Sequence, residues 1–222
     1  MNVTTQSSAV GQRSYHHQPP SLYVINSFYE WVVEVSADLA RIAVRDSAAV
    51  KAARVDEITR LLTLEARLLD QGTLAQENQR ALAQEAYGHW LALFADECAY
   101  WIPANIPAAD PRQTVALEFH DRRRLLDRVA RLGTGFAFSQ SPASHTSRQW
   151  SGLEIWPSPN RTDEWRARCS FMLVESREGH GRVLSGWNGF VLRETPDGLR
   201  IVLKQINLID CDRMQGNNSF FL

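Results

Sequence analysis

Cysteine is scarce in this sequence. The 222 residues contain three cysteines, Cys98, Cys169 and Cys211, which lie far apart. They form no Cys-x-x-Cys pair, and no Cys-x-His pair occurs, so the spacing excludes an iron–sulfur cluster held by this chain. An odd and scattered set is typical of reduced thiols rather than of a disulfide framework, which favours a cytoplasmic protein.

Long apolar runs and concentrated charge are also absent. No run approaches the roughly 20 apolar residues that a membrane-spanning helix needs, and residues 1–20 lack the basic and then apolar order of a signal peptide. Lysine and arginine number 24 against 25 aspartate and glutamate, and the densest basic cluster, Arg122–Arg124, lies in a helical pattern. We therefore expect neither a membrane nor a nucleic acid as partner, because nucleic-acid binding needs a concentrated basic surface.

The motifs of nucleophilic and phosphate chemistry are missing as well. There is no Gly-x-Ser-x-Gly nucleophile elbow, and Gly133-Thr134-Gly135 is too short for a phosphate-binding loop, so it predicts a tight turn. The one close pairing of a histidine with a carboxylate in the sequence is His120-Asp121. Adjacent residues on a helix point in different directions, so this pair is a poor ligand set and we expect no metal site in the chain.

General acid–base chemistry stays open. A carboxylate and a histidine or tyrosine in the mouth of a fold can act as an acid–base pair if one pKa is raised. Each candidate also has a structural explanation, as a turn, core or strand residue. The candidates are Asp96, Tyr100, His120, Asp121 and His145.

The first half of the chain predicts helices. Residues 1–20 are polar and predict a flexible arm, and residues 21–57 carry apolar residues at helical spacing. A leucine stripe predicts a helix from Ile58 to Gly72, where the glycine predicts the stop. Further helical patterns run from Leu74 to Asp96 and from Asp121 to Leu132.

Strands fill the rest of the chain. From Phe136 onward the sequence is rich in β-branched and aromatic residues, and Glu178–Gly181 and Pro196–Gly198 are hairpin signals. Helices followed by a long antiparallel sheet predict an α+β domain over residues 58–222, in which a strongly curved sheet wraps the helices as a cone. The apolar end, Phe220–Leu222, indicates docking rather than fraying.

Five segments spread over residues 58–212 carry a family resemblance. They are EARLLD (Glu65–Asp70), YGHWLALFADECAYWIP (Tyr87–Pro103), DRRRLLDRVARLGTG (Asp121–Gly135), SPASHTSRQWSGLEI (Ser141–Ile155) and GRVLSGWNGFVLRETPDGLRIVLKQINLIDCD (Gly181–Asp212). In order and spacing they resemble the small, or beta, subunit of the aromatic-ring-hydroxylating dioxygenases. The chain departs from the family pattern by an added helical segment, Gln71–Ala86, and by a longer N-terminal region.

The resemblance implies a fold and a role. The family's cone fold is shared with nuclear transport factor 2, ketosteroid isomerase and scytalone dehydratase, and its usual assembly joins three alpha with three beta subunits. The alpha subunit holds the Rieske 2Fe-2S cluster and the mononuclear Fe(II), and a ferredoxin and a reductase act indirectly. By resemblance, this chain is a non-catalytic subunit that braces alpha subunits and contacts other beta subunits. It has no catalytic, cofactor-binding or metal residue of its own, and the complex adds dioxygen to an aromatic ring.

Two other interpretations stay open. The chain could be a stand-alone isomerase, dehydratase or hydrolase of the cone fold, using a pair such as Asp96 with His120 or His145, since a shared fold does not transmit activity. It could also be a ligand-binding or scaffold protein with another partner.

Under the dioxygenase interpretation, we expect the subunit interface on the outer face of the sheet and on one helix face. Tryptophan and arginine dominate binding energies at interfaces, so we expect the interface to contain residues of these two types. The predicted interface residues are Arg122, Arg124, Arg148, Trp150, Arg166 and Arg168.

Overall fold

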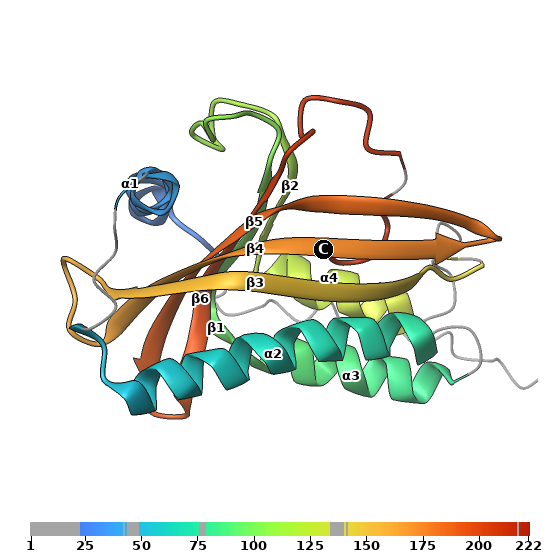
Figure 1. Ribbon diagram of the computed structural model, residues 1–222, viewed down its shortest axis with the longest axis horizontal. Helices are drawn as coiled ribbons and strands as arrows, with labels where there is room; N and C mark the ends of the chain where they lie inside the picture. Colours follow the sequence, from blue (N-terminus) through green and yellow to red (C-terminus); the bar gives the residue numbers. More distant parts are fainter. Residues whose placement is uncertain are drawn as a thin grey trace, which may run out of the picture.

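One curved sheet and the helices packed on it make up the structure, a computed structural model (Figure 1). It describes residues 23–41, 43, 49–75, 79–133, 140, 142–216 and 218–222. The helices in these ranges are α1 (Asn26–Ala40), α2 (Ala52–Ala75), α3 (Arg80–Ala92) and α4 (Arg122–Gly133). The strands are β1 (Phe94–Pro103), β2 (Ala116–Asp121), β3 (His145–Pro157), β4 (Glu164–Arg177), β5 (His180–Thr195) and β6 (Gly198–Leu208). The α+β class expected from the sequence is confirmed.

The sheet has the strand order β2-β1-β6-β5-β4-β3. All neighbouring strands run antiparallel except β1 and β6, which are parallel. The two predicted hairpins are confirmed. Glu178 and Gly179 take left-handed conformations, with φ of 51° and 77°, in the turn between β4 and β5, and Gly198, the first residue of β6, has a φ of 97°. A left-handed pair matches the turn to the twist of the strands it joins.

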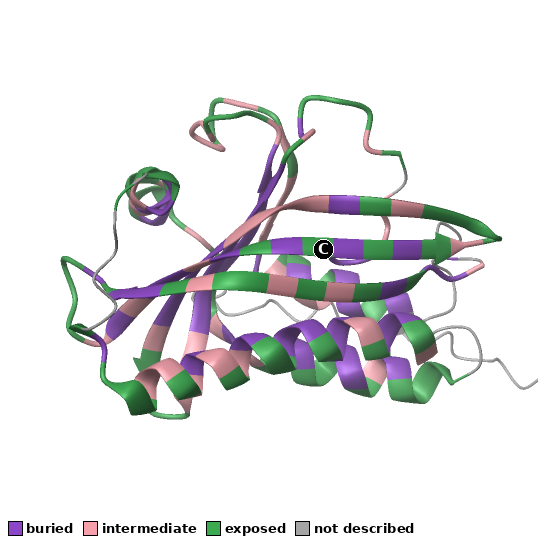
Figure 2. Ribbon diagram, viewed as in Figure 1, coloured by how far each residue is buried: buried purple, intermediate pink, exposed green. Residues whose placement is uncertain are grey.

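The sheet is covered on both faces, but by different helices. In Figure 1, α1 lies on the opposite side of the sheet from α2 and α3. Alternate side chains along β4 point to opposite faces, so Ala167, Cys169 and Leu173 join the core shared with α2, α3 and α4. Val32 of α1 belongs to a second core on the outer face. Figure 2 shows the consequence, with the central part of the sheet mostly buried and the long strands alternating.

Helix α1 is fixed to the outer face by one buried charge pair. Arg166 of β4 donates from Nη1 to Oδ2 of Asp38 at 2.5 Å, and Trp156 of β3 donates to the same oxygen at 3.0 Å. The Arg166 side chain is only 2% exposed. The polar side chain of Arg166 therefore serves internal packing of α1 on the sheet.

Two helix boundaries expected from the sequence are wrong. Helix α2 does not stop at Gly72 but continues to Ala75, and the missing side chain of Gly72 makes room for Tyr87 on α3. A Cβ atom at Gly72 would lie 2.7 Å from Tyr87 Cε1. The next helix ends at Ala92, so the expected helical stretch up to Asp96 is instead the start of β1. The glycine is a packing residue rather than a stop signal.

Strand β2 was not predicted. Phe119 and His120 belong to this edge strand and not to the helix that follows it. Asp121 ends the strand, and its Oδ1 accepts a hydrogen bond from the backbone N–H of Arg124 at 2.9 Å, which caps the first turn of α4. His120 and Asp121 therefore do not lie on one helix, as the sequence reading assumed.

The expected division of the chain stays a prediction. Helix α2 begins at Ala52, ahead of the predicted domain start at residue 58, and residues 1–20 lie outside the described ranges. No helix within those ranges is long and apolar enough to cross a membrane.

Candidate functional site

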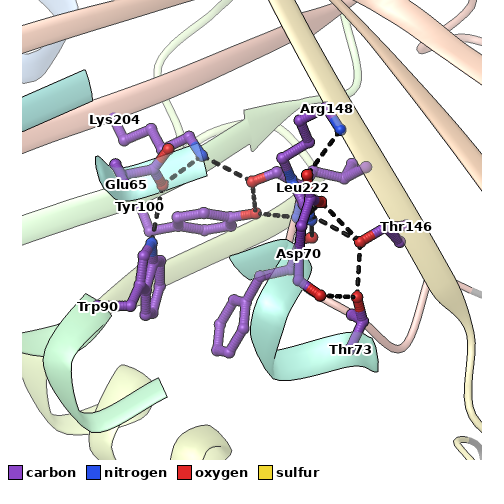
Figure 3. Close-up of polar contacts among 10 residues, drawn as sticks. Glu65, Asp70, Thr73, Trp90, Tyr100, Thr146, Arg148, Lys204 and Leu222 are labelled. Carbon is purple, nitrogen blue, oxygen red and sulfur yellow. Dashed lines mark hydrogen bonds and ion pairs between the residues drawn. The ribbon is translucent and has the colours of Figure 1, made fainter. Parts of the chain in front are cut away.

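A buried ion pair lies at the base of the concave face. Lys204 of β6 donates from Nζ to Oε1 of Glu65 on α2 at 2.7 Å, and Trp90 Nε1 donates to the same oxygen at 2.8 Å (Figure 3). The two charged side chains are 1% and 4% exposed. Burial lowers the pKa of Lys204, while the Glu65 carboxylate acts in the opposite direction. A charge in this position needs its partner, because desolvation of an isolated ion costs several kcal/mol.

The last residues of the sequence dock into the same interior. The main-chain oxygen of Leu222 accepts hydrogen bonds from Lys204 Nζ at 2.7 Å and from Tyr100 Oη at 3.0 Å. The N–H of Leu222 lies 2.7 Å from the same Tyr100 hydroxyl oxygen. The ring of Phe221 packs on Trp90, with 4.4 Å between centroids. Phe220–Leu222, called the end segment below, therefore fills the cone, as its apolar composition indicated.

Two arginines, one on β3 and one on α4, donate hydrogen bonds to the end segment. Arg148 of β3 donates from Nη1 to Asp70 and from Nη2 to the main-chain oxygen of Phe221. Arg128 of α4 donates to the main-chain oxygen of Phe220 at 2.7 Å, and its guanidinium lies 4.3 Å from the Phe221 ring centroid. The segment is therefore held by main-chain hydrogen bonds as well as by apolar packing.

A hollow of about 530 Å³ opens between β2 and α4. His120 lies in its wall, with Nε2 3.2 Å from Arg128 Nη1 and 3.5 Å from Glu118 Oε2. Arg128 also forms an ion pair with Glu118. The hollow thus combines one histidine with an already paired arginine and carboxylate, and Asn218 and Ser219 form part of its edge.

The acid–base candidates do not converge on this hollow. Tyr100 lies opposite His120 in the β1–β2 register, but it is fully buried, and burial raises its pKa well above the ordinary value. Asp96 is exposed, four residues before Tyr100 on β1, which is roughly 13 Å along a strand. Asp121 caps α4. His145 is at the start of β3, and β6, β5 and β4 separate that strand from β1.

The six residues predicted for the interface do not share one face. The β3–β4 register places Arg148 opposite Leu173 and Trp150 opposite Phe171, and these partners face the concave core. The prediction that Arg148 and Trp150 lie on the outer face is therefore wrong. Sequence alternation alone could not reveal this, because a bulge between Ser151 and Glu154 shifts the β3 register.

The other four residues differ in exposure. Arg166 is buried against α1 by its ion pair with Asp38. Arg168 stacks its guanidinium 4.2 Å from the Trp187 ring centroid on the outer face. Arg122 donates to the main-chain oxygen of Leu91 and so ties α4 to the end of α3. Arg124 is exposed on α4.

The three cysteines are buried and form no disulfide in the part of the chain that the structure describes. Burial raises the pKa of Cys98 and of Cys169 to about 12 each. In the described ranges, no group of three or more histidine, cysteine or acidic side chains is arranged to hold a metal ion.

The sequence reading missed the buried pair, although both residues carry a signal. Glu65 follows Leu62 by three residues and precedes Leu68 by three, so it lies on the apolar stripe of its helix. Lys204 interrupts an apolar run in a strand that is covered on both faces. A charged residue at a core position of each element indicates a pair.

Comparison with known proteins places the chain in a family. A family model described as "Ring hydroxylating beta subunit" matches residues 77–214. The small oxygenase component of the p-cumate 2,3-dioxygenase system of Pseudomonas putida is 28% identical over 169 residues, which covers 75% of this chain and 86% of that protein.

Solved structures agree in fold. The beta subunit of benzoate 1,2-dioxygenase from Burkholderia mallei superposes with a TM-score of 0.54 at 20% identity, over 78% of this chain and 97% of that one. A chain of naphthalene 1,2-dioxygenase with indole bound in the active site gives 0.59 at 21% identity, over 90% and 100%. The cone fold is confirmed, and the chain belongs to the family of beta subunits of ring-hydroxylating dioxygenases.

Proposed function

We propose that this chain is the non-catalytic structural subunit of an aromatic-ring-hydroxylating dioxygenase. Its partner is an alpha subunit that carries the Rieske cluster and the mononuclear iron and adds dioxygen to an aromatic ring. The observation that supports the proposal most is the family match over residues 77–214. The usual assembly of the family implies three copies of each subunit, with contacts between beta subunits.

The filled interior supports a structural role. The space inside the cone is occupied by the Glu65–Lys204 pair and by the end segment, and the cavity left beside them is about 20 Å³. That volume is enough for about one water molecule. A filled interior of this kind suits a subunit that braces a partner.

Co-expression with the adjacent large-subunit candidate tests the proposal. We expect the two chains to co-purify as one hetero-oligomer, with iron and the visible absorption of an iron–sulfur cluster in the complex and neither in this chain alone. Either of two results would contradict the proposal. One is turnover of substrate by this chain alone, and the other is a folded chain that does not bind the large subunit.

Two arginine variants test which surface of the chain forms the subunit interface. Arg124 and Arg168 keep surface exposure, so we expect Arg124→Ala and Arg168→Ala to weaken co-purification while the chain stays folded. Arg60, exposed on α2 and paired loosely with Asp56 at 3.8 Å, provides the matched control. Arg148→Ala is expected to destabilise the chain itself, because it releases both Asp70 and the end segment.

A further inference from the structure

The end segment lies in a pocket with aromatic walls. The Phe221 ring is surrounded by Tyr87, Trp90 and Tyr100, with centroid distances of 5.9, 4.4 and 5.8 Å. These three walls come from α3 and β1 and are at most 1% exposed. Aromatic rings at such distances favour a flat aromatic guest in tilted or edge contact. The shape of this pocket therefore selects a single planar ring.

The polar groups of the pocket are mostly donors. Four donors from three strands and one helix point at main-chain oxygens of the end segment. They are Lys204 Nζ and Tyr100 Oη at Leu222, Arg148 Nη2 at Phe221 and Arg128 Nη2 at Phe220. If the end segment leaves, each of the four donors loses its acceptor. An unsatisfied donor costs far more free energy in a buried site than in water.

Two polar groups beside the end segment stay unpaired even with the segment in place. Within the described ranges, Tyr87 Oη and Arg148 Nε are buried without a hydrogen-bond partner. Each cation in the pocket already has a carboxylate partner, namely Glu65 for Lys204, Asp70 for Arg148 and Glu118 for Arg128. A guest that satisfies the pocket must therefore bring acceptor oxygens, and a charged acceptor makes the stronger hydrogen bonds.

We propose that the end segment is a built-in occupant of a binding pocket for a small aromatic carboxylate, and that such a molecule competes with the segment for the pocket. The ring of the guest takes the place of the Phe221 ring, and its carboxylate takes the place of the main-chain oxygens that Lys204, Tyr100 and Arg148 bind. The cavity of about 20 Å³ beside Leu222 is too small for the guest. Binding therefore requires displacement of the segment.

The residues that lead into the end segment border an open hollow. Asn218 and Ser219 form part of the edge of the hollow of about 530 Å³ between β2 and α4. This hollow is the space toward which we expect the segment to move. The apparent affinity of a guest is lowered by the fraction of time that the segment occupies the pocket, so weakening the segment strengthens guest binding.

Titration of the full-length chain with benzoate tests the proposal. Phe221→Ala removes the competing ring, and we expect benzoate to bind this variant at least about tenfold more tightly than the unaltered chain, measured by calorimetry. Toluene, which lacks the carboxylate, should bind the variant at least about tenfold more weakly than benzoate. Adding Tyr100→Phe to the Phe221→Ala variant should weaken the binding of benzoate and leave the binding of toluene unchanged.

A control variant distinguishes a specific binding pocket from an unspecific cavity. Phe28→Ala opens a comparable space in the outer-face core, where Phe28 is 5% exposed, and it should gain no affinity for benzoate. Equal binding of toluene and benzoate to Phe221→Ala, or no benzoate binding by the folded variant, would overturn the proposal.

A second measurement covers the case in which Phe221→Ala does not fold. In the unaltered chain, saturating benzoate should increase amide hydrogen exchange in residues 218–222, as mass spectrometry can follow. If exchange in these residues is the same with saturating benzoate as with a neutral salt, the segment and benzoate do not compete for the pocket. Neither measurement needs the partner subunit, so a failure of this inference is distinguishable from a failure of the proposed function.

Discussion

Lys204 and Glu65 show how two charged residues can be core residues. Their side chains are nearly inaccessible, and Trp90 and Leu222 complete their hydrogen bonds. Such a pair adds little net stability, because the attraction between the charges is offset by the loss of their hydration. Removal of one partner has a much larger effect, since the other charge is then buried without compensation.

A double-mutant cycle tests this coupling. Lys204→Met leaves the Glu65 carboxylate with Trp90 as its donor, and we expect the free energy of unfolding to fall by about 3–5 kcal/mol. Glu65→Gln in the same chain removes the uncompensated charge and keeps an acceptor for Trp90, so the double variant should be more stable than Lys204→Met. Urea unfolding measures all four proteins. Strictly additive losses would contradict the coupling.

Elements were predictable where their signals are local. The long strands and both hairpins follow from alternation and turn residues, and Ala167, Cys169 and Leu173 alternate onto the core face of β4. Strand β2 was missed because it is a short edge strand whose identity depends on pairing with β1. The side of the sheet on which Arg148 lies was missed because the β3 bulge changes the register. The donors of the pocket come from distant parts of the sequence, so no local pattern could show that they converge.

Gly72 and Gly88 provide a test of helix packing, because a side chain would meet a neighbouring ring at Gly72 and nothing at Gly88. Gly72→Ala gains up to about 1 kcal/mol of helix propensity, but its Cβ would lie 2.7 Å from Tyr87 Cε1 and Cζ. Overpacking in a core costs about 1–3 kcal/mol, so we expect net destabilisation and a wider spacing of α2 and α3. Gly88→Ala in α3 meets nothing within 4 Å and should stabilise the chain by up to about 1 kcal/mol.

Thermal unfolding distinguishes these two glycine variants. If Gly72→Ala melts at or above the unaltered chain, the contact of Gly72 with Tyr87 does not limit the approach of α2 to α3. Tyr87→Leu combined with Gly72→Ala removes the contacting ring atoms and should recover part of the loss.

At the scale of the whole molecule, burial on both faces of the sheet leaves several ionisable groups neutral in the core. Burial raises the pKa of Cys98, Cys169 and Tyr87 to about 12, from ordinary values of 9.0, 9.0 and 10.0. A folded-state pKa above the unfolded value means that the unfolded chain loses its proton first. The stability tied to these groups is therefore fully present below about pH 9 and is lost as pH rises toward about 12.

The chain should consequently unfold in mild alkali. Each thiol contributes a loss of about 1.4 kcal/mol per pH unit within this window, so two thiols and a tyrosine remove several kcal/mol between about pH 9 and about pH 10.5. Urea unfolding across this range measures the slope. The Cys98→Ala/Cys169→Ala double variant should show a flatter slope, because two of the groups whose pKa is raised in the folded chain are then missing. Parallel curves for the two proteins would mean that the thiols are accessible enough to ionise in the folded chain, and a thiol-reactive reagent would then label them at neutral pH.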